Sequence, residues 1–197
     1  MNTNLVLVTT KEQQSLARII VENYHSYVPH YESMGRRIDW LIEYEKRIVG
    51  MIGVGSATYP PPKDLLTFLD MTKKDYGILF NQFANNWRFC LVERIKNLGT
   101  TTLKKLRKAA PIEWKKKYGD DLVYLMTFVG GGHDGAVYRA DNWTEIGWTS
   151  GLPPHKSSSM KWNTATELKS KFVKPTGENQ KIIFIKKIGD WWKQVGE

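Results

Sequence analysis

The sequence has little cysteine, no long hydrophobic run and fewer acidic than basic residues. Its single cysteine, Cys90, lies within the apolar run Phe89-Cys90-Leu91-Val92. One cysteine excludes an intrachain disulfide and a zinc site built from cysteines, and an apolar setting is typical of a small buried side chain. No stretch is long and apolar enough for a transmembrane helix, and the amino-terminal Met-Asn-Thr-Asn does not resemble a signal peptide. We therefore expect a cytoplasmic protein without a membrane partner.

The charge balance points to an anionic partner. Lysine and arginine number 29 against 20 aspartate and glutamate residues, which gives a net charge of +9. A fold does not need that surplus, and anionic polymers are its usual reason. Eight tryptophans supply core area or surfaces on which bases stack. The charge therefore indicates an anionic polymer such as a nucleic acid, or a membrane surface, as the partner, and a homodimer is a further option.

The chain is long enough for one domain with a full core. Its 197 residues are 41% hydrophobic, which is a globular composition. We find no internal repeat and no interdomain linker, so we predict a single domain over residues 1–197 with a polar segment, 151–180, before a final strand.

Alternating strand and helix patterns predict a mixed, twisted α/β sheet flanked by helices. Glu45-Lys46 is a turn between two strands, and Pro111 is expected to separate two helices because proline suits the first turn of a helix. The predicted strands are Leu5–Val8, Arg37–Tyr44, Arg47–Ser56, Trp87–Glu93, Asp121–Val129, Trp143–Thr149 and Lys181–Ile188. The predicted helices are Lys11–Tyr24, Asp70–Asn86, Thr100–Ala109, Ile112–Tyr118 and a short one after Gly132.

A strand, a short glycine-containing turn and a helix follow one another around Gly99. Backbone amides at a helix N-terminus bind anions such as phosphate, and threonine hydroxyls add donors. We therefore take Asn97, Gly99, Thr100 and Thr101 as candidate cofactor contacts, with Arg94 beside them. The alternative is an ordinary capped helix, because this turn is not a P-loop.

A second segment, residues 132–149, predicts a short helix that carries Tyr138, then a turn at Asn142 and a strand. Together the two segments have the layout of GNAT acetyltransferases. In that fold the first segment holds a pyrophosphate and the second carries a tyrosine beside the thiol end of the cofactor. The likeness implies a GNAT-like fold, an acyl-CoA-like donor by analogy, and a contact from Asn142.

The second segment also resembles a specific family. Gly132-His133-x-Gly135-x-x-Tyr138-Arg139-Ala140-x-Asn142-Trp143-x-x-x-Gly147 is similar to the hallmark segment of Mom-like DNA-modification proteins and of the Druantia-type domain of phage-defence proteins. Upstream, His25-Ser26-Tyr27, Gly50-x-x-Gly53-x-Gly55-Ser56-Ala57, Arg94-Ile95-Lys96-Asn97-Leu98-Gly99-Thr100 and Trp114-Lys115-Lys116-Lys117-Tyr118-Gly119 match the Druantia-type domain. The likeness extends over roughly residues 20–150.

The resemblance implies modification of a nucleobase, adenine in the Mom-like proteins. Its functional positions fall on His25, Tyr27, Arg94 and Thr100. The aspartate that the family carries shortly before the Gly-His pair has no counterpart here, and Asp134 is the nearest acid.

Histidines near these positions leave several roles open. His25, Tyr27, His30 and Tyr31 lie within seven residues and can hold a metal such as iron, move protons or serve structure. His133, beside three glycines, is a candidate catalytic residue or part of a hinge.

Basic residues crowd one part of the chain. Residues 88–117 contain ten lysines and arginines and two glutamates. A charged helix face is often only solvated surface, but beside a candidate site it also suits phosphate contacts. The nucleic-acid-binding candidates are Lys104, Lys105, Arg107, Lys108, Lys115, Lys116, Lys117 and Trp143.

Three functions follow from these features. The first is an enzyme that flips a base into a pocket lined by Tyr27, Tyr138 and Trp143 and transfers a small group to its exocyclic amine, with His25 or His133 moving the proton. The second is a non-catalytic DNA-binding subunit of a defence system, which the missing aspartate favours. The third is a small-molecule or protein N-acetyltransferase.

Overall fold

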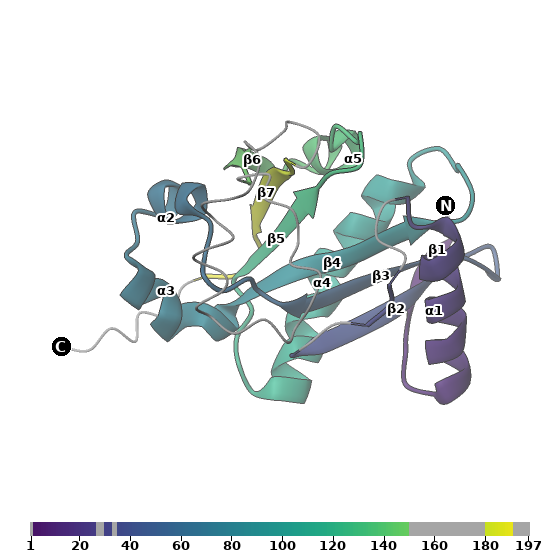
Figure 1. Cartoon of the computed structure of the whole chain (residues 1–197). Coiled ribbons are helices and arrows are strands. Elements are labelled where there is room, and N and C mark those ends of the chain that lie inside the picture. Colours follow the sequence, from purple (N-terminus) through teal and green to yellow (C-terminus); the bar gives the residue numbers. More distant parts are fainter. Residues whose placement is uncertain (1, 27–29, 33–34, 150–179, 191–197) are drawn as a thin grey trace, which may run out of the picture.

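The computed structural model describes residues 2–26, 30–32, 35–149 and 180–190. These residues form one seven-stranded sheet in the order β1-β2-β3-β4-β5-β7-β6 with helices on both faces, which confirms the predicted fold class (Figure 1). The strands are β1 Thr3–Leu7, β2 Arg37–Tyr44, β3 Arg47–Ser56, β4 Phe83–Leu91, β5 Tyr124–Val129, β6 Thr144–Trp148 and β7 Ile182–Lys187. The helices are α1 Lys11–Tyr24, α2 Lys63–Leu69, α3 Lys73–Leu79, α4 Leu98–Tyr118 and α5 Ala136–Ala140. The predicted polar segment 151–180 falls almost wholly outside the described residues.

The β2–β3 hairpin and α1 follow the sequence closely. Glu45 and Lys46 both have positive φ, 49° and 66°, as a two-residue turn between antiparallel strands requires. The helix α1 begins after Thr10, whose side chain accepts from the backbone of Gln13 while the Gln13 side chain caps the Thr10 amide. Both elements have the predicted bounds because their signals are local.

The predicted helix over Asp70–Asn86 is confirmed only in its middle, over α3, and is wrong at both ends. Asp70 ends α2 in the left-handed conformation, with φ 51°, and Thr72 and Asp75 form a capping box that starts α3. From Phe83 the chain enters the sheet as β4, between β3 and β5. The apolar spacing over 76–83 fits a helix, but sheet pairing overrides it beyond residue 82.

The predicted break at Pro111 is also wrong, because α4 is continuous through it. A proline inside a helix costs about 3 kcal/mol, since it removes a donor and crowds the preceding turn. Leu103, Leu106 and Trp114 are fully buried along one side of α4, and each large buried apolar side chain contributes about 1.5–3 kcal/mol. Packing against the sheet therefore outweighs the proline.

The two parallel strands at the centre of the sheet stay paired only briefly. β4 and β5 are in register over Phe83–Asn85 and Tyr124–Met126 and then diverge. At the point of divergence β4 has a bulge: Val54 pairs with Asn86 and Gly53 with Arg88, so Trp87 is an extra residue. Figure 1 shows the two strands spreading towards α5. This divergence creates the only gap between neighbouring central strands in the part of the chain that is described.

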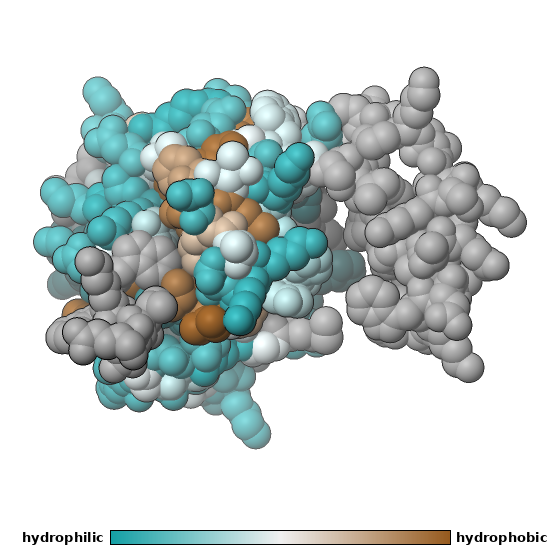
Figure 2. All heavy atoms as spheres, turned by 90° about the vertical axis from the view of Figure 1, so that its left-hand side faces the viewer, coloured by the Kyte–Doolittle hydropathy of each residue, from teal (hydrophilic) through white to brown (hydrophobic). Residues whose placement is uncertain are grey.

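The helices divide between the two faces. A core around Trp40, Ile52 and Phe184 lies under α4 and α5, while α1 packs on Leu41 and Met51 on the opposite face. Near α2 and α3 apolar residues reach the surface, among them Phe68 and Ile78, and Figure 2 shows this apolar region among hydrophilic residues. Within the described residues, no helix has the length and apolarity to cross a membrane.

Candidate functional site

A cleft of about 550 Å³ lies where β4 and β5 diverge. Residues from the end of α1, from β4, from β5 and from α5 form its walls. Five of the seven predicted catalytic residues line it: His25, Arg94, His133, Asp134 and Tyr138. A second hollow of similar volume, beside Tyr31 and Arg37, contains none of them. The fold therefore gathers residues that are more than 100 positions apart around one opening.

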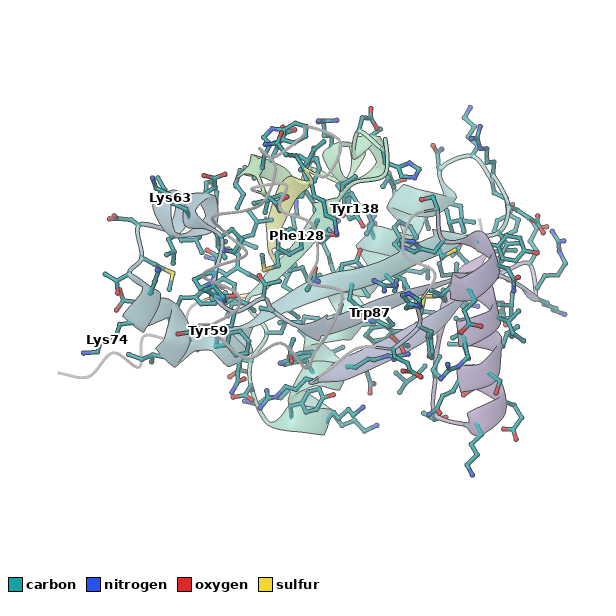
Figure 3. All side chains as sticks on the ribbon, viewed as in Figure 1. Tyr59, Lys63, Lys74, Trp87, Phe128 and Tyr138 are labelled. Carbon is teal, nitrogen blue, oxygen red and sulfur yellow. The ribbon has the colours of Figure 1, made fainter. Side chains whose placement is uncertain are left out.

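Asn86 ties the point of divergence together. Its side-chain nitrogen donates to the carbonyls of Gly53, at 2.8 Å, and Arg88, at 3.1 Å. Its side-chain oxygen accepts from the Tyr138 hydroxyl at 2.7 Å, and its backbone oxygen accepts from Thr127 at 3.2 Å. The side chain and backbone of one buried residue thus join β3, β4, β5 and α5. In Figure 3, Tyr138 descends from α5 towards β4, with Phe128 on β5 nearby.

Ser26 and His133 meet at the mouth of the cleft. Ser26 Oγ lies 2.7 Å from His133 Nε2, although the two residues are 107 positions apart. Glycines at 131, 132 and 135, all with positive φ, give the His133 loop the shape that this contact needs. The pair joins the end of α1 to the loop before α5.

His25 lies in a cationic part of the same wall. Burial lowers its pKa to about 4, and the nearby charges of Arg88, His133 and Lys181 act in the same direction. Burial and Arg88 likewise lower the pKa of Lys181. His25 is therefore neutral at pH 7, in a setting that favours anionic over cationic ligands.

The candidate cofactor contacts around Gly99 lie next to the cleft rather than in its lining. Asn97 caps α4 in the left-handed conformation, and the Thr100 hydroxyl donates to its carbonyl at 3.1 Å. Gly99 packs against Val137, which does line the cleft. Thr101 donates its amide to Asn97 as the helix starts. The two predicted segments therefore meet through Gly99 and Val137.

Asn142 and Asp134 lie at the edges of this arrangement. Asn142 makes a left-handed turn after α5, outside the cleft lining, and its carbonyl accepts from Lys186. Asp134 is largely exposed and accepts from the Ala136 amide at 3.0 Å. Tyr27 falls outside the described residues.

One predicted nucleic-acid contact, Trp143, is corrected by its burial, and another, Arg107, has a partner within the fold. Trp143 is 4% exposed, packs edge-on against Tyr138 and donates to Asp141, so its ring has no open face for a base. Arg107 makes two hydrogen bonds to Asp141, of 2.9 and 2.7 Å. The Arg107 side chain thus holds α4 to the turn after α5.

The lysines of α4 have different surroundings. Lys104, Lys108 and Lys116 are exposed, and Lys105 is partly buried. Lys115 pairs with Asp121 at 3.0 Å, and Lys117 donates to the Arg37 carbonyl. Lys115 and Lys117 are exposed as well, so all of these lysines except Lys105 belong to the accessible part of the predicted basic face.

The described residues do not support the predicted metal site. Within the described residues no three histidine, cysteine or acidic side chains group as metal ligands require. The expectation of iron near His25 and His30 therefore has no ligand set, and the neighbouring charges of His25 are positive.

Asn86 in the cleft, and a network of side chains beside the cleft, were not predicted from the sequence. Asp39, buried in β2, accepts from Tyr31, Arg37 and Trp87, and the Arg37 guanidinium packs against both the Tyr31 and Trp87 rings. This network fixes the β4 bulge against the start of β2. The sequence could have indicated Asn86, because asparagine is uncommon in strands. Nothing in the sequence could have indicated Asp39, since its partners come from other segments of the chain.

Comparisons with known proteins agree with this geometry. A putative GNAT-family acetyltransferase from Desulfovibrio desulfuricans is similar over 95% of this chain and 99% of its own, with 10% identity and a TM-score of 0.55. A ribosomal-protein alanine N-acetyltransferase from Escherichia coli is similar over 99% of both chains, with 11% identity and a TM-score of 0.55. An aminoglycoside acetyltransferase solved in complex with coenzyme A covers 93% of this chain and 95% of its own, with 9% identity and a TM-score of 0.52.

These identities are too low to show more than the fold, which is that of GNAT acetyltransferases. No curated protein is similar enough in sequence to count as a match. The family model of the Druantia protein DruA, however, matches residues 1–184, nearly the whole sequence. The chain therefore belongs to the Druantia DruA family.

Proposed function

We propose that this chain transfers an acyl-type group from a thioester donor to the exocyclic amine of a DNA base, with adenine as the expected base. The observation that carries the proposal is the cleft between β4 and β5, where His25, Arg94, His133 and Tyr138 converge. We propose the donor class by analogy with other proteins of this fold, and DNA as the acceptor because of the sequence resemblance.

The strands around the cleft fit an acyl-CoA-like donor. Beyond Asn86 and Met126 the facing edges of β4 and β5 are not paired with each other, so their backbone groups can bond the amides of an extended donor arm. Arg94 and the start of α4 adjoin the same opening and suit its phosphates. A thioester donor would supply an activated acyl carbon at this point.

The residues of the cleft then have distinct tasks. As the amine nitrogen bonds to the acyl carbon, the carbon–sulfur bond breaks, the rest of the donor leaves as a thiolate, and the amine loses a proton. His25 is neutral at pH 7 and can accept it, and His133, whose ring contacts Ser26, is the alternative base. Arg94 and the backbone amides at the start of α4 would hold the negative groups of the donor, since the Thr100 hydroxyl already donates to the Asn97 carbonyl.

Acceptor binding would use the exposed part of α4. Lys104, Lys108 and Lys116 are accessible and can contact phosphates of duplex DNA. Because Trp143 is buried, the flipped base would rest on other walls of the cleft.

The purified chain, incubated with duplex DNA and radiolabelled acetyl-CoA, tests the proposal. We expect label in DNA with the native chain and none with Arg94→Ala, whose exposed side chain leaves folding intact. A matched variant, Lys46→Ala, removes a charge from the distant β2–β3 turn and should keep full transfer. Labelling of peptides or small amines with no label in DNA would instead support the N-acetyltransferase function that the solved GNAT structures suggest.

The non-catalytic alternative makes a different prediction. A DNA-binding subunit would bind duplex DNA with steep salt dependence and transfer nothing from any thioester donor. The absence of an acid between Val129 and His133 is the observation that favours it.

A further inference from the structure

The side chain of Asn86 has only one chemically consistent orientation. It is 3% exposed, and one end of its amide faces the carbonyl oxygens of Gly53 and Arg88 at 2.8 and 3.1 Å. Carbonyl oxygens only accept hydrogen bonds, so the amide nitrogen must face them. The reversed orientation would set oxygen against two oxygens and leave buried groups unsatisfied, at about 1–3 kcal/mol each.

This orientation fixes the direction of the hydrogen bond to Tyr138. Both hydrogens on Asn86 Nδ2 are used, and Asn86 Oδ1 can only accept. At 2.7 Å from that oxygen, the Tyr138 hydroxyl must therefore donate its single proton to Asn86. Towards any group inside the cleft, Tyr138 then presents lone pairs.

The ring of Tyr138 is also held in place. It is 7% exposed, lies edge-on to Trp143 at 5.1 Å and stacks on Phe184 at 5.7 Å between centroids. Gly135, at the start of α5, brings the backbone so close to Phe184 that a β-carbon there would stand 2.4 Å from that ring. These contacts prevent the phenol from turning away from Asn86.

We propose that Asn86 is a positioning residue that makes Tyr138 a hydrogen-bond acceptor in the cleft, and that the group it meets there is the N–H of the acceptor amine. Tyr138 thus orients the amine and does not supply a proton to the leaving group. The identity of the amine rests on the proposed function, whereas the direction of the Tyr138 hydrogen bond does not.

Labelled-tyrosine NMR tests the direction of the bond without any activity. The full chain carrying tyrosine labelled at Cζ is observed in equal parts of H2O and D2O, and the Tyr138 signal is assigned with Tyr138→Phe. A hydroxyl proton held by Asn86 exchanges slowly, so we expect separate signals for the protonated and deuterated forms, which merge in Asn86→Ala. A single averaged Tyr138 signal in the native chain would overturn the proposal.

Steady-state kinetics test the role of Tyr138. For transfer to DNA, Tyr138→Phe should raise the KM for DNA about fivefold, as loss of one hydrogen bond of about 1 kcal/mol implies. A catalytic acid makes kcat fall at high pH, when the acid loses its proton. Because the phenol does not act as an acid, any such fall in kcat should occur at the same pH in Tyr138→Phe as in the native chain. Tyr76→Phe, which removes a buried hydroxyl bonded to the Thr58 carbonyl outside the cleft, is the matched control and should leave KM unchanged.

If the fall in kcat at high pH disappeared in Tyr138→Phe, Tyr138 would be the proton donor, which contradicts the proposal. Absence of transfer by the native chain would contradict the proposed function instead, and the tyrosine spectrum would still decide the direction of the bond.

Discussion

Gly99, at the start of α4, lies directly against Val137 of α5: a β-carbon at position 99 would stand 2.6 Å from Val137 Cγ2. This contact joins the two segments that the sequence singles out as carrying the chemistry. Valine is stiff about its first side-chain torsion, so it cannot easily move aside. The start of α4 can adjoin the wall of the cleft only because residue 99 has no side chain.

Gly99→Ala should therefore lower the free energy of unfolding by about 1–2 kcal/mol. Overpacking costs about 1–3 kcal/mol, which exceeds the gain of up to about 1 kcal/mol from placing alanine in a helix. In a Val137→Ala background the clash is gone, and the same change should stabilise the chain. Urea unfolding of the four chains measures both effects, and an equal effect in both backgrounds would rule out the contact as the cause.

Arg107 and Lys108 are neighbours on α4 with opposite expected roles. Arg107→Gln should destabilise the chain by about 3 kcal/mol, because it leaves the buried carboxylate of Asp141 without its cation. Lys108→Gln should change stability by less than about 0.5 kcal/mol, since Lys108 is exposed. Thermal or urea unfolding of the two variants provides the comparison.

The same pair separates folding from DNA contact. With Lys108→Gln the affinity for duplex DNA should fall, and the slope of log affinity against log salt should decrease by about one. Unchanged affinity and slope after replacement of Lys104, Lys108 and Lys116 together would show that these three lysines do not contact DNA.

The sequence predicted elements whose signals are local and failed where distant pairing decides. The β2–β3 hairpin and α1 depend on the Glu45-Lys46 turn and the Thr10 cap, and both were predicted with the observed bounds. The segment around Tyr76 and Phe83 has helical spacing, yet β3 and β5 draw Phe83 into the sheet. The Thr72–Asp75 capping box was a readable sign of a new helix start.

Prediction of the site residues from the sequence likewise succeeded for some residues and failed for others. Motif resemblance pointed to His25, Arg94, His133 and Tyr138, and the fold brings all four to one cleft. Trp143 looked like a stacking surface, but its partners Tyr138 and Asp141 enclose it. Residue type suggests what a side chain can do, whereas burial decides whether a ligand can reach it.

His25 should contribute to the pH dependence of stability. Its folded pKa, about 4, lies below the ordinary value of 6.5, so protonation opposes folding. The contribution is fully present above about pH 6.5 and is lost as pH falls towards 4. We expect His25→Asn to lose less stability than the native chain between pH 7 and 4.5, measured by urea unfolding at each pH. Identical losses in the two chains would contradict the burial of His25.

Cys90 lines the cleft but should take no part in its chemistry. Burial raises the pKa of the thiol to about 11, and the side chain is 3% exposed with its sulfur 3.6 Å from the Ile20 carbonyl. We expect a thiol reagent to label Cys90 only after unfolding, and Cys90→Ala to retain acyl transfer. Rapid labelling of the folded chain, with loss of transfer in Cys90→Ala, would make Cys90 a candidate nucleophile.

Mass spectrometry of the nucleosides in DNA from cells that express the chain tests the central claim most directly. The account predicts a deoxyadenosine of increased mass with the native chain and its absence with Arg94→Ala. Unmodified nucleosides with the native chain, together with salt-sensitive binding of the same chain to DNA, would contradict it.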